Sequence, residues 1–285
     1  MPSTCIITDS SAQFSRHSFP GRNLVYQVPF RIKVNDNYVE NDPLFKVTNF
    51  PSRMSGENAP LLFSPTIQEC MDSISLYSQT FDEIIAIFMS SQLTGAFQNM
   101  EKASKNKRGK VSIVVIDSLT TSIGLGSLVQ VAAEQAAHGS KLSDIEHKVR
   151  GKIPMIYSQF CIANLSYLQS HNFLTEPQAI LGEMLSVLPV FSFEEGKIIA
   201  AEKVKNYRHL LENYQEFIDE FSDLDQVALI QSQPPLLHET HTLREHVNGT
   251  FPGTPFSELP INLVLAALFG PASVGIYAIE GRNSR

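Results

Sequence analysis

Cysteine is scarce in this sequence, with only three residues, Cys5, Cys70 and Cys161, in a chain of 285. An odd number at wide spacings favours reduced, buried thiols over a disulfide framework or a zinc site. Basic residues are also in the minority: 22 Lys and Arg stand against 29 Asp and Glu, which argues against nucleic acid as a partner. The amino terminus lacks the basic start and long apolar middle of a secretory signal, so a cytoplasmic location is expected.

Motifs for binding nucleotides and cofactors are missing as well. There is no G-x-x-x-x-G-K-[ST] sequence, so ATP is not expected to bind here as it does in a P-loop enzyme. Gly124 and Gly126 lack the third glycine and the downstream acidic partner of a dinucleotide loop, and close helix packing explains them better. The sequence therefore predicts no resident cofactor.

One stretch, residues 261–279, imitates a membrane span because it is apolar and carries no charge. It is interrupted by Asn262, Gly270, Pro271 and Gly275, and the Gly-Pro pair indicates a turn after a buried strand. We therefore expect this stretch to form part of the core of a soluble domain.

The first half of the chain repeats one pattern: an apolar run, a loop rich in hydroxyl groups, and a segment with helical periodicity. The apolar runs are residues 5–7, 83–88 and 111–116, and the loops after them begin at residues 8, 90 and 117. This rhythm is typical of parallel strands joined by crossover helices. Because the carboxyl ends of parallel strands meet at one edge of the sheet, the three loops predict a ligand site there. Helix amino termini at that edge suit an anion.

Two domains are predicted, an amino-terminal α/β domain with a parallel sheet at residues 1–152 and a smaller mixed α/β domain at residues 153–285. The boundary follows from a helical pattern over residues 142–149 that ends near Gly151, with Pro154 as the next break.

The second domain alternates helical and strand-like patterns. Helical patterns cover residues 176–188 and 207–221, and strand-like runs cover 187–193, 197–201 and 227–231. The sequence Glu194-Glu195-Gly196 predicts a hairpin turn between the first two of these strands. In the first domain, residues 34–65 show no sustained period and are expected to form a surface excursion that covers the crevice.

Short motifs along the chain occur in the order and spacing of one known family. They are residues 6–12, 90–98, 117–126, 165–168, 188–190, 195–197 and 270–275. Residues 117–126 read D-S-L-T-T-S-I-G-L-G, where the family has D-S-x-x-x-S-x-G-x-G. Residues 90–98 read S-S-Q-L-T-G-A-F-Q, similar to the family's S-S-x-L-S-G-T-Y-Q. On these motifs the chain resembles the DegV family over nearly its whole length.

The resemblance implies a two-domain α/β protein that is not an enzyme but binds one long-chain fatty acid or related lipid. The acyl chain would lie in an apolar tunnel, with the head group near the domain junction. In some members a separate ATP-dependent fatty-acid kinase then phosphorylates the carboxylate. The tail would supply affinity, at about 0.8 kcal/mol per buried methylene. The head group would fix the orientation, because a carboxylate that leaves water needs hydrogen-bond donors.

Thr94 and Gly95 are the first choice for the head-group contact, because the Thr94 hydroxyl and the Gly95 N–H offer two donors at a helix start. The other residues predicted to contact the ligand are Thr8, Asp9, Ser10, Ser64, Ser91, Asp117, Ser118, Phe173 and Leu268. Ser and Asp before a helix are also common amino-terminal caps, so loop building is the favoured alternative for the Ser and Asp residues of this set.

Three positions depart from the family pattern. Where the family places a hydroxyl, a guanidinium and an imidazole, this sequence has Pro60, Phe173 and Leu268, or Phe269 if the alignment slips by one residue. We therefore expect neutral donors alone to hold the head group. We do not expect the protein to be an efficient substrate carrier for a fatty-acid kinase. The candidate donors are Thr94, Gly95, Ser64 and His171.

Two other interpretations are open. Residues 238–241 read H-E-T-H, with His246 beyond, which puts imidazoles at helical spacing. They do not form H-E-x-x-H, so a solvated helix start after Pro234-Pro235 is favoured over a metal site. A small-molecule hydrolase or phosphatase that acts through the Ser and Asp loops is the alternative function, although no serine lies in G-x-S-x-G.

Overall fold

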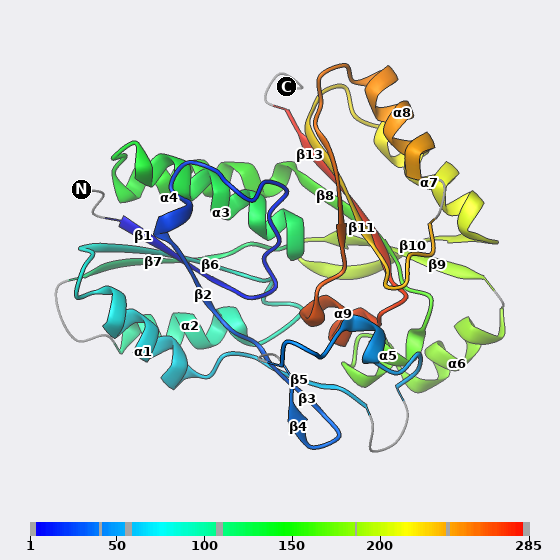
Figure 1. Cartoon of the computed structure of the whole chain (residues 1–285), viewed down its shortest axis with the longest axis horizontal. Helices are drawn as coiled ribbons and strands as arrows, with labels where there is room; N and C mark the ends of the chain where they lie inside the picture. Colours follow the sequence, from blue (N-terminus) through cyan, green and yellow to red (C-terminus); the bar gives the residue numbers. More distant parts are fainter. Residues whose placement is uncertain are drawn as a thin grey trace. The chain divides into compact units, whose positions relative to one another are not determined.

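The computed structural model describes residues 4–39, 42–54, 59–106, 111–185, 187–237 and 240–281 (Figure 1). Close contacts along the chain divide it into two compact units. The first unit consists of Met1–Arg31, Phe63–Met155 and Glu195–Lys197, and the second of Ile32–Leu62, Ile156–Glu194 and Ile198–Arg285. Residues 32–62 thus group with the second unit, whereas the division predicted from the sequence placed them in the first domain.

The first unit is built on a parallel sheet of four strands in the order β2-β1-β6-β7. The strands are β1 (Thr4–Asp9), β2 (Val25–Val28), β6 (Glu83–Phe88) and β7 (Ser112–Asp117). The helices are α1 (Ile67–Tyr77), α2 (Ala96–Lys105), α3 (Ser122–Ala137) and α4 (Leu142–Lys152). Helices α1 and α2 lie on one face of the sheet and α3 and α4 on the other (Figure 1). The predicted parallel α/β fold and its three strands are confirmed.

The composition of the strands explains their place in the middle of this unit. Every residue of β1 is buried, and so are five of the six residues of β6. Continuous runs such as Ile84-Ile85-Ala86-Ile87 are typical of parallel strands that helices cover on both faces. Because β1, β6 and β7 are parallel, the loops that follow them start at the same edge of the sheet.

Helix α3 packs tightly against the loop after β1. The Gln13 N–H donates to Ser122 O (3.1 Å), and the Ser122 hydroxyl donates to Gln13 Oε1 (2.8 Å). A Cβ atom at Gly126 would overlap the backbone carbonyl of Gln13. The sequence-based interpretation of Gly126 as a close-packing residue is confirmed.

We expect Gly126→Ala to lower the free energy of unfolding by about 2 kcal/mol, because the added methyl group must displace backbone atoms. The matched control is Gly151→Ala, also in a helix, where an added Cβ has no atom within 4 Å. Higher helix propensity should stabilise that variant by up to about 1 kcal/mol. Urea unfolding of both variants checks this pair, and shifts of the same sign would contradict it.

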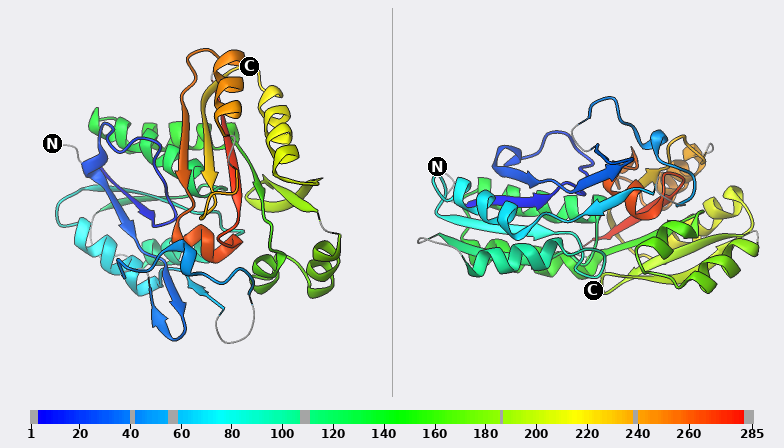
Figure 2. Two further views of the ribbon diagram at one scale, coloured as in Figure 1. Left: turned by 45° about the vertical axis from the view of Figure 1, so that its right-hand side comes forward. Right: turned by 90° about the horizontal axis from the view of Figure 1, so that it is seen from below.

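The second unit contains a mixed sheet of six strands in the order β10-β9-β8-β13-β11-β12. They are β8 (Ile156–Cys161), β9 (Leu188–Glu194), β10 (Lys197–Val204), β11 (Leu224–Gln231), β12 (Phe256–Pro260) and β13 (Val274–Glu280). The helices are α5 (Leu165–Ser170), α6 (Glu176–Met184), α7 (Tyr207–Asp219), α8 (Thr240–Thr250) and α9 (Leu263–Phe269). A three-stranded sheet, β4-β3-β5, consists of β3 (Arg31–Val34), β4 (Asn37–Tyr38) and β5 (Leu61–Phe63). Figure 2 shows these elements from two further directions.

The predicted hairpin between β9 and β10 is confirmed. Glu195 and Gly196 have φ angles of 48° and 80°, the left-handed conformation of a two-residue hairpin turn. The helix predicted before it, over residues 176–188, is too long, because α6 ends at Met184 and β9 begins at Leu188.

The predicted strand at the start of residues 261–279 is wrong, because this segment is helix α9. The Asn262 side chain caps the helix by accepting a hydrogen bond from the Leu265 N–H (2.9 Å). A short apolar run fits a strand or a buried helix equally well, and only the cap distinguishes them. The expected burial is confirmed, and in the described part of the chain no helix is long and apolar enough to cross a membrane.

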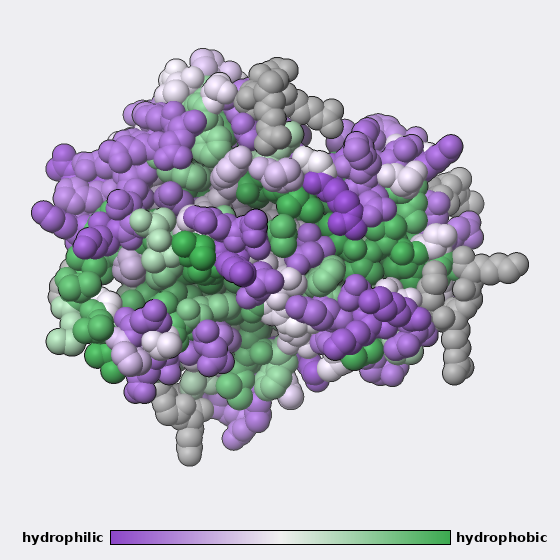
Figure 3. Space-filling model, turned by 180° about the vertical axis from the view of Figure 1, so that it is seen from behind, coloured by the Kyte–Doolittle hydropathy of each residue, from purple (hydrophilic) through white to green (hydrophobic). Residues whose placement is uncertain are grey.

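Helix α6 turns its larger apolar residues outward. A Cβ at Gly182 would overlap the Leu165 side chain, and Ala179 is buried. Exposed large side chains on and just after the helix are Ile180, Leu181, Met184 and Leu185. Apolar side chains gather in this area at the lower left of Figure 3. The apolar period thus predicted a helix but not which of its faces is buried.

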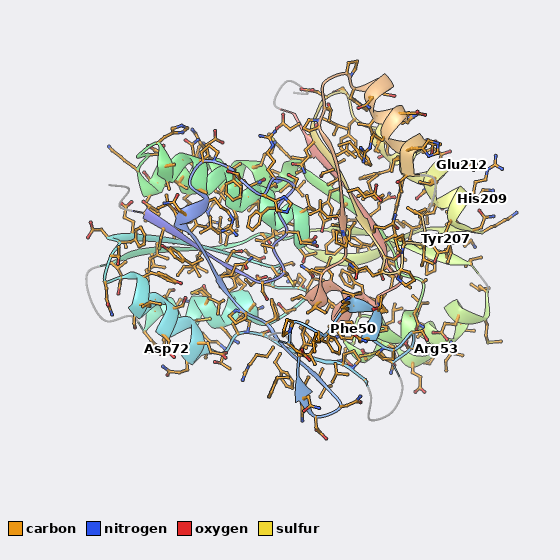
Figure 4. The ribbon with its side chains drawn as sticks, in the orientation of Figure 1. Phe50, Arg53, Asp72, Tyr207, His209 and Glu212 are labelled. Carbon is orange, nitrogen blue, oxygen red and sulfur yellow. The ribbon has the colours of Figure 1, made fainter. Side chains whose placement is uncertain are left out.

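Residues 34–65, which show no sustained period in the sequence, include the short strands β4 and β5 and the 3-10 helix η2 (Val47–Asn49). Residues 51–54 are anchored on α5, within the second unit. The Tyr167 hydroxyl donates to Pro51 O (2.6 Å), and the Met54 N–H donates to Ser166 Oγ (2.9 Å). Arg53, labelled in Figure 4, forms an ion pair with Glu183. A covering role for this segment stays a prediction.

Candidate functional site

The loop between β6 and α2 presents the two residues predicted first. Gly95 is the exposed N-cap of α2, and its N–H donates to Ser64 Oγ (3.1 Å). Thr94 is half-buried; its hydroxyl donates to Met89 Sδ (3.7 Å) and accepts from the Ala96 N–H (3.5 Å). The structure thus brings Ser64 and Gly95 into direct contact and places Thr94 beside them.

This arrangement is a set of neutral donors at the start of a helix. Since Ser64 Oγ accepts from Gly95, its own proton is available for another acceptor. Helix α2 has ten residues and no side-chain cap, so its first N–H groups and its dipole favour an acceptor oxygen. A Cβ at Gly95 would meet only Ser64 Oγ, at 3.7 Å, so the backbone here is open to approach.

The polar residues after β1 build the loop. Asp9 is fully buried: one of its oxygens accepts from the Ser11 N–H (2.9 Å) and hydroxyl, and the other from the Met89 N–H (2.6 Å). Burial raises the pKa of Asp9, and the three donors oppose that rise. Ser10 Oγ accepts from the Phe30 N–H (2.9 Å). These contacts fit the loop-building alternative, and a ligand contact at Asp9 or Ser10 stays a prediction.

The residues after β7 have the same character. Asp117 Oδ1 accepts from the N–H groups of Ser91 and Leu119, each at 3.1 Å. The buried Ser118 hydroxyl donates to Thr120 O (3.1 Å) and accepts from the Thr120 N–H (3.3 Å). Ser91 is therefore tied to the β7 loop through its backbone, which brings two of the three predicted loops together.

Two buried hydroxyls at this edge are unpaired. Thr8 Oγ1, on β1, and Thr120 Oγ1 lie below the surface without a hydrogen-bond partner in the part of the chain described. Such groups are uncommon in folded proteins and call for a water or a ligand. Thr8 was predicted as a contact; Thr120 was not, because nothing in the sequence marks a threonine whose hydroxyl is unpaired.

The remaining predicted residues belong to the second unit. Leu268 is buried in α9, with 1% of its surface exposed, and Pro60 is buried. Phe173 is half-buried, and its ring centre lies 6.2 Å from that of His171. The His171 Nε2 atom contacts Ala267 O (3.0 Å), an acceptor, so Nε2 carries the proton. Burial lowers the pKa of His171, which favours the neutral form of the ring, while the contact with Ala267 O opposes this shift.

The predicted preference against a metal site can be tested only in part. His238 and Glu239 lie outside the described residues. His246 Nε2 lies 2.7 Å from Asp219 Oδ1, and among the described residues no group of three His, Cys, Asp or Glu side chains could hold a metal ion.

Comparison with known proteins identifies the relatives of this chain. A family model described as "Uncharacterised protein, DegV family" matches residues 3–281. The chain belongs to the DegV family. The DegV domain-containing protein spr1415 of Streptococcus pneumoniae is 25% identical over 275 residues, which are 95% of this chain and 96% of that protein. The membership predicted from the motifs is confirmed.

Solved DegV structures share the fold. The fatty acid binding DegV family protein SAG1342 of Streptococcus agalactiae matches with a TM-score of 0.82 and 21% identity, over 98% of this chain and 99% of that one. The Streptococcus pneumoniae fatty acid kinase (Fak) B3 protein, solved with linoleic acid, matches with a TM-score of 0.83 and 16% identity, over 98% and 100%. The predicted DegV fold class is therefore confirmed.

Proposed function

We propose that this DegV protein binds and carries a single long-chain fatty acid or related lipid, with its tail in an apolar tunnel. The observation that carries the proposal is the open, neutral donor set of Ser64, Thr94 and Gly95 at the start of α2. The fold also supports the proposal, because this chain shares it with a DegV protein that is described as fatty acid binding. The tail needs only burial, while the head group needs such donors.

A carrier is favoured over a hydrolase or phosphatase. His171 contacts a backbone carbonyl and His246 an aspartate, so neither imidazole is paired with a serine hydroxyl among the described residues. A serine nucleophile needs an adjacent base. Turnover of ester or phosphate-ester substrates by the purified protein would contradict the carrier assignment.

We also propose that the protein works in the cytoplasm. Cys5, Cys70 and Cys161 are free and buried, as predicted, and burial raises the pKa of each thiol to about 12. Three unreactive thiols without a disulfide suit a reducing compartment. Cell fractionation checks this, and recovery of the protein outside the cytoplasm would contradict it.

Thr94→Val should weaken binding of a fatty acid without unfolding the protein. Valine keeps the shape of the side chain and removes only the hydroxyl, whose present partners are weak: a sulfur at 3.7 Å and an N–H at 3.5 Å. A lost hydrogen bond to a charged group costs about 1.5–3 kcal/mol, and one to a neutral group less. Fluorescence titration with cis-parinaric acid measures the change, and Thr94→Ser, which retains the hydroxyl, is the control. Equal affinity of both variants would exclude Thr94 as a contact.

The head group should bind in a neutral form. A partly buried carboxyl group that only neutral donors contact has its pKa raised by desolvation. Binding of the free acid should therefore weaken as the pH rises from about 5 to about 9, while binding of the methyl ester should stay constant. Displacement titrations with both ligands test this. A strong preference for the ionised acid at high pH would contradict binding in the neutral form. It would then favour a protein that presents a carboxylate to a fatty-acid kinase.

A further inference from the structure

The tip of the β9–β10 hairpin, Glu195–Lys197, groups with the first unit, while the rest of both strands groups with the second. Gly196 O accepts a hydrogen bond from the Ser90 hydroxyl at 2.8 Å, and Ser90 is completely buried. Ser90 lies at the start of the loop that carries Thr94 and Gly95. The tip therefore contacts the start of the proposed ligand-binding loop.

Ser90 organises that loop through all of its polar atoms. Its carbonyl accepts from the N–H groups of Leu93 (3.0 Å) and Thr94 (3.3 Å). Its hydroxyl also accepts from the Gln92 N–H (3.2 Å), and its own N–H donates to Thr120 O (2.9 Å). The backbone of Thr94 is thus one hydrogen bond away from the residue that holds the hairpin tip.

The fit at the tip leaves no room for a side chain. A Cβ at Gly196 would overlap Ser90 Oγ and lie 3.2 Å from Leu119 Cα. Leu119 itself has a φ of 52°, a left-handed conformation that is uncommon outside glycine and costs about 1 kcal/mol or more. Such strain persists only where surrounding contacts impose it, and it is found preferentially at functional loops.

We propose that the hairpin tip is a positioning element for the ligand-binding loop, with Ser90 and Gly196 as the positioning residues. The inference rests on the proposed function. The tip fixes Ser90, and Ser90 fixes the backbone that presents Thr94 and Gly95. We call the contact between Ser90 and Gly196 the clamp. Donors that are fixed before the ligand arrives lose less entropy when it binds, so the clamp raises affinity without touching the ligand.

Gly196→Ala tests the clamp in the full-length protein. We expect it to weaken binding of cis-parinaric acid about tenfold, the cost of losing one well-placed hydrogen bond to the ligand. Two control variants separate a specific loss of binding from a loss of stability. In Gly21→Ala the new Cβ overlaps the Ala133 backbone in the same unit, and Gly139→Ala carries the same left-handed φ with nothing within 4 Å. Both should bind within about twofold of wild type once corrected for the folded fraction.

A double-mutant cycle distinguishes positioning from mere stability. Thr94→Val should have little further effect in the Gly196→Ala background, because the loop is already misplaced. In the Gly21→Ala background it should cost as much as in wild type. Full additivity with Gly196→Ala would overturn the proposal.

If Gly196→Ala does not fold, Ser90→Ala replaces it, since it removes only the hydroxyl. Its control is Ser127→Ala, which removes a buried hydroxyl that donates to Gly124 O at a similar 2.9 Å. Weaker binding in Ser90→Ala alone supports the clamp, and equal binding in both variants overturns it. Failure of the wild type to bind would instead reject the proposed function, so the two failures are distinguishable.

Discussion

Replacing palmitic acid with decanoic acid should weaken binding by roughly 5 kcal/mol, a factor of more than about 10³. Palmitic acid has six more methylene groups, and each contributes about 0.8 kcal/mol when buried. The head groups are identical, so the contacts at Ser64, Thr94 and Gly95 do not change between the two ligands. A tail that rests on the surface would lose much less, because it stays in water over most of its length.

Competition against cis-parinaric acid, below the concentrations at which these acids form micelles, measures the ratio. Intermediate chain lengths give the slope per methylene. A slope near zero would show that the tail is not buried and would contradict the tunnel, even if some binding were observed.

Asp9→Asn should lower the free energy of unfolding by about 3 kcal/mol, although the two side chains have nearly the same shape. Both oxygens of Asp9 accept: one from the Ser11 N–H and hydroxyl, the other from the Met89 N–H. An amide has a single acceptor atom, so its NH2 group must face an N–H donor in a fully buried site. An unpaired buried donor costs about 1–3 kcal/mol, and here two donors oppose each other.

Asp117→Asn is the matched control. In its described contacts, a single Asp117 oxygen accepts from both Ser91 and Leu119, so the amide oxygen can keep both bonds. We expect a change of less than about 1 kcal/mol in urea unfolding. Equal losses in the two variants would show that the Asp9 network does not carry the stability assigned to it.

The parts of the fold that were predictable are those that neighbouring residues encode. The strand at 83–88 was placed correctly because a buried parallel strand is a short, unbroken apolar run. The β9–β10 turn followed from Glu195-Gly196, where both residues adopt a left-handed φ and glycine does so without strain. Helix α9 was missed because an apolar run of this length fits either structure.

Contacts between residues far apart in sequence were not predictable. The grouping of residues 32–62 with the second unit and the hydrogen bond from Ser90 to Gly196 depend on packing across 100 residues or more. At the candidate site, two donors at a predicted helix start pointed to Thr94 and Gly95, while the preference of Ser and Asp for helix caps indicated loop building for Asp9 and Asp117. The unpaired hydroxyl of Thr120 was not predictable, because burial and hydrogen bonding are properties of the folded chain.

Mass spectrometry of lipid extracted from the purified, denatured protein tests the central claim most directly. Because a buried acyl chain dissociates slowly, we expect about one long-chain lipid per protein chain, retained through purification. Stripped protein should take up added fatty acid to the same ratio. Protein that carries no lipid after purification, and binds none when long-chain fatty acids are offered, would contradict the account.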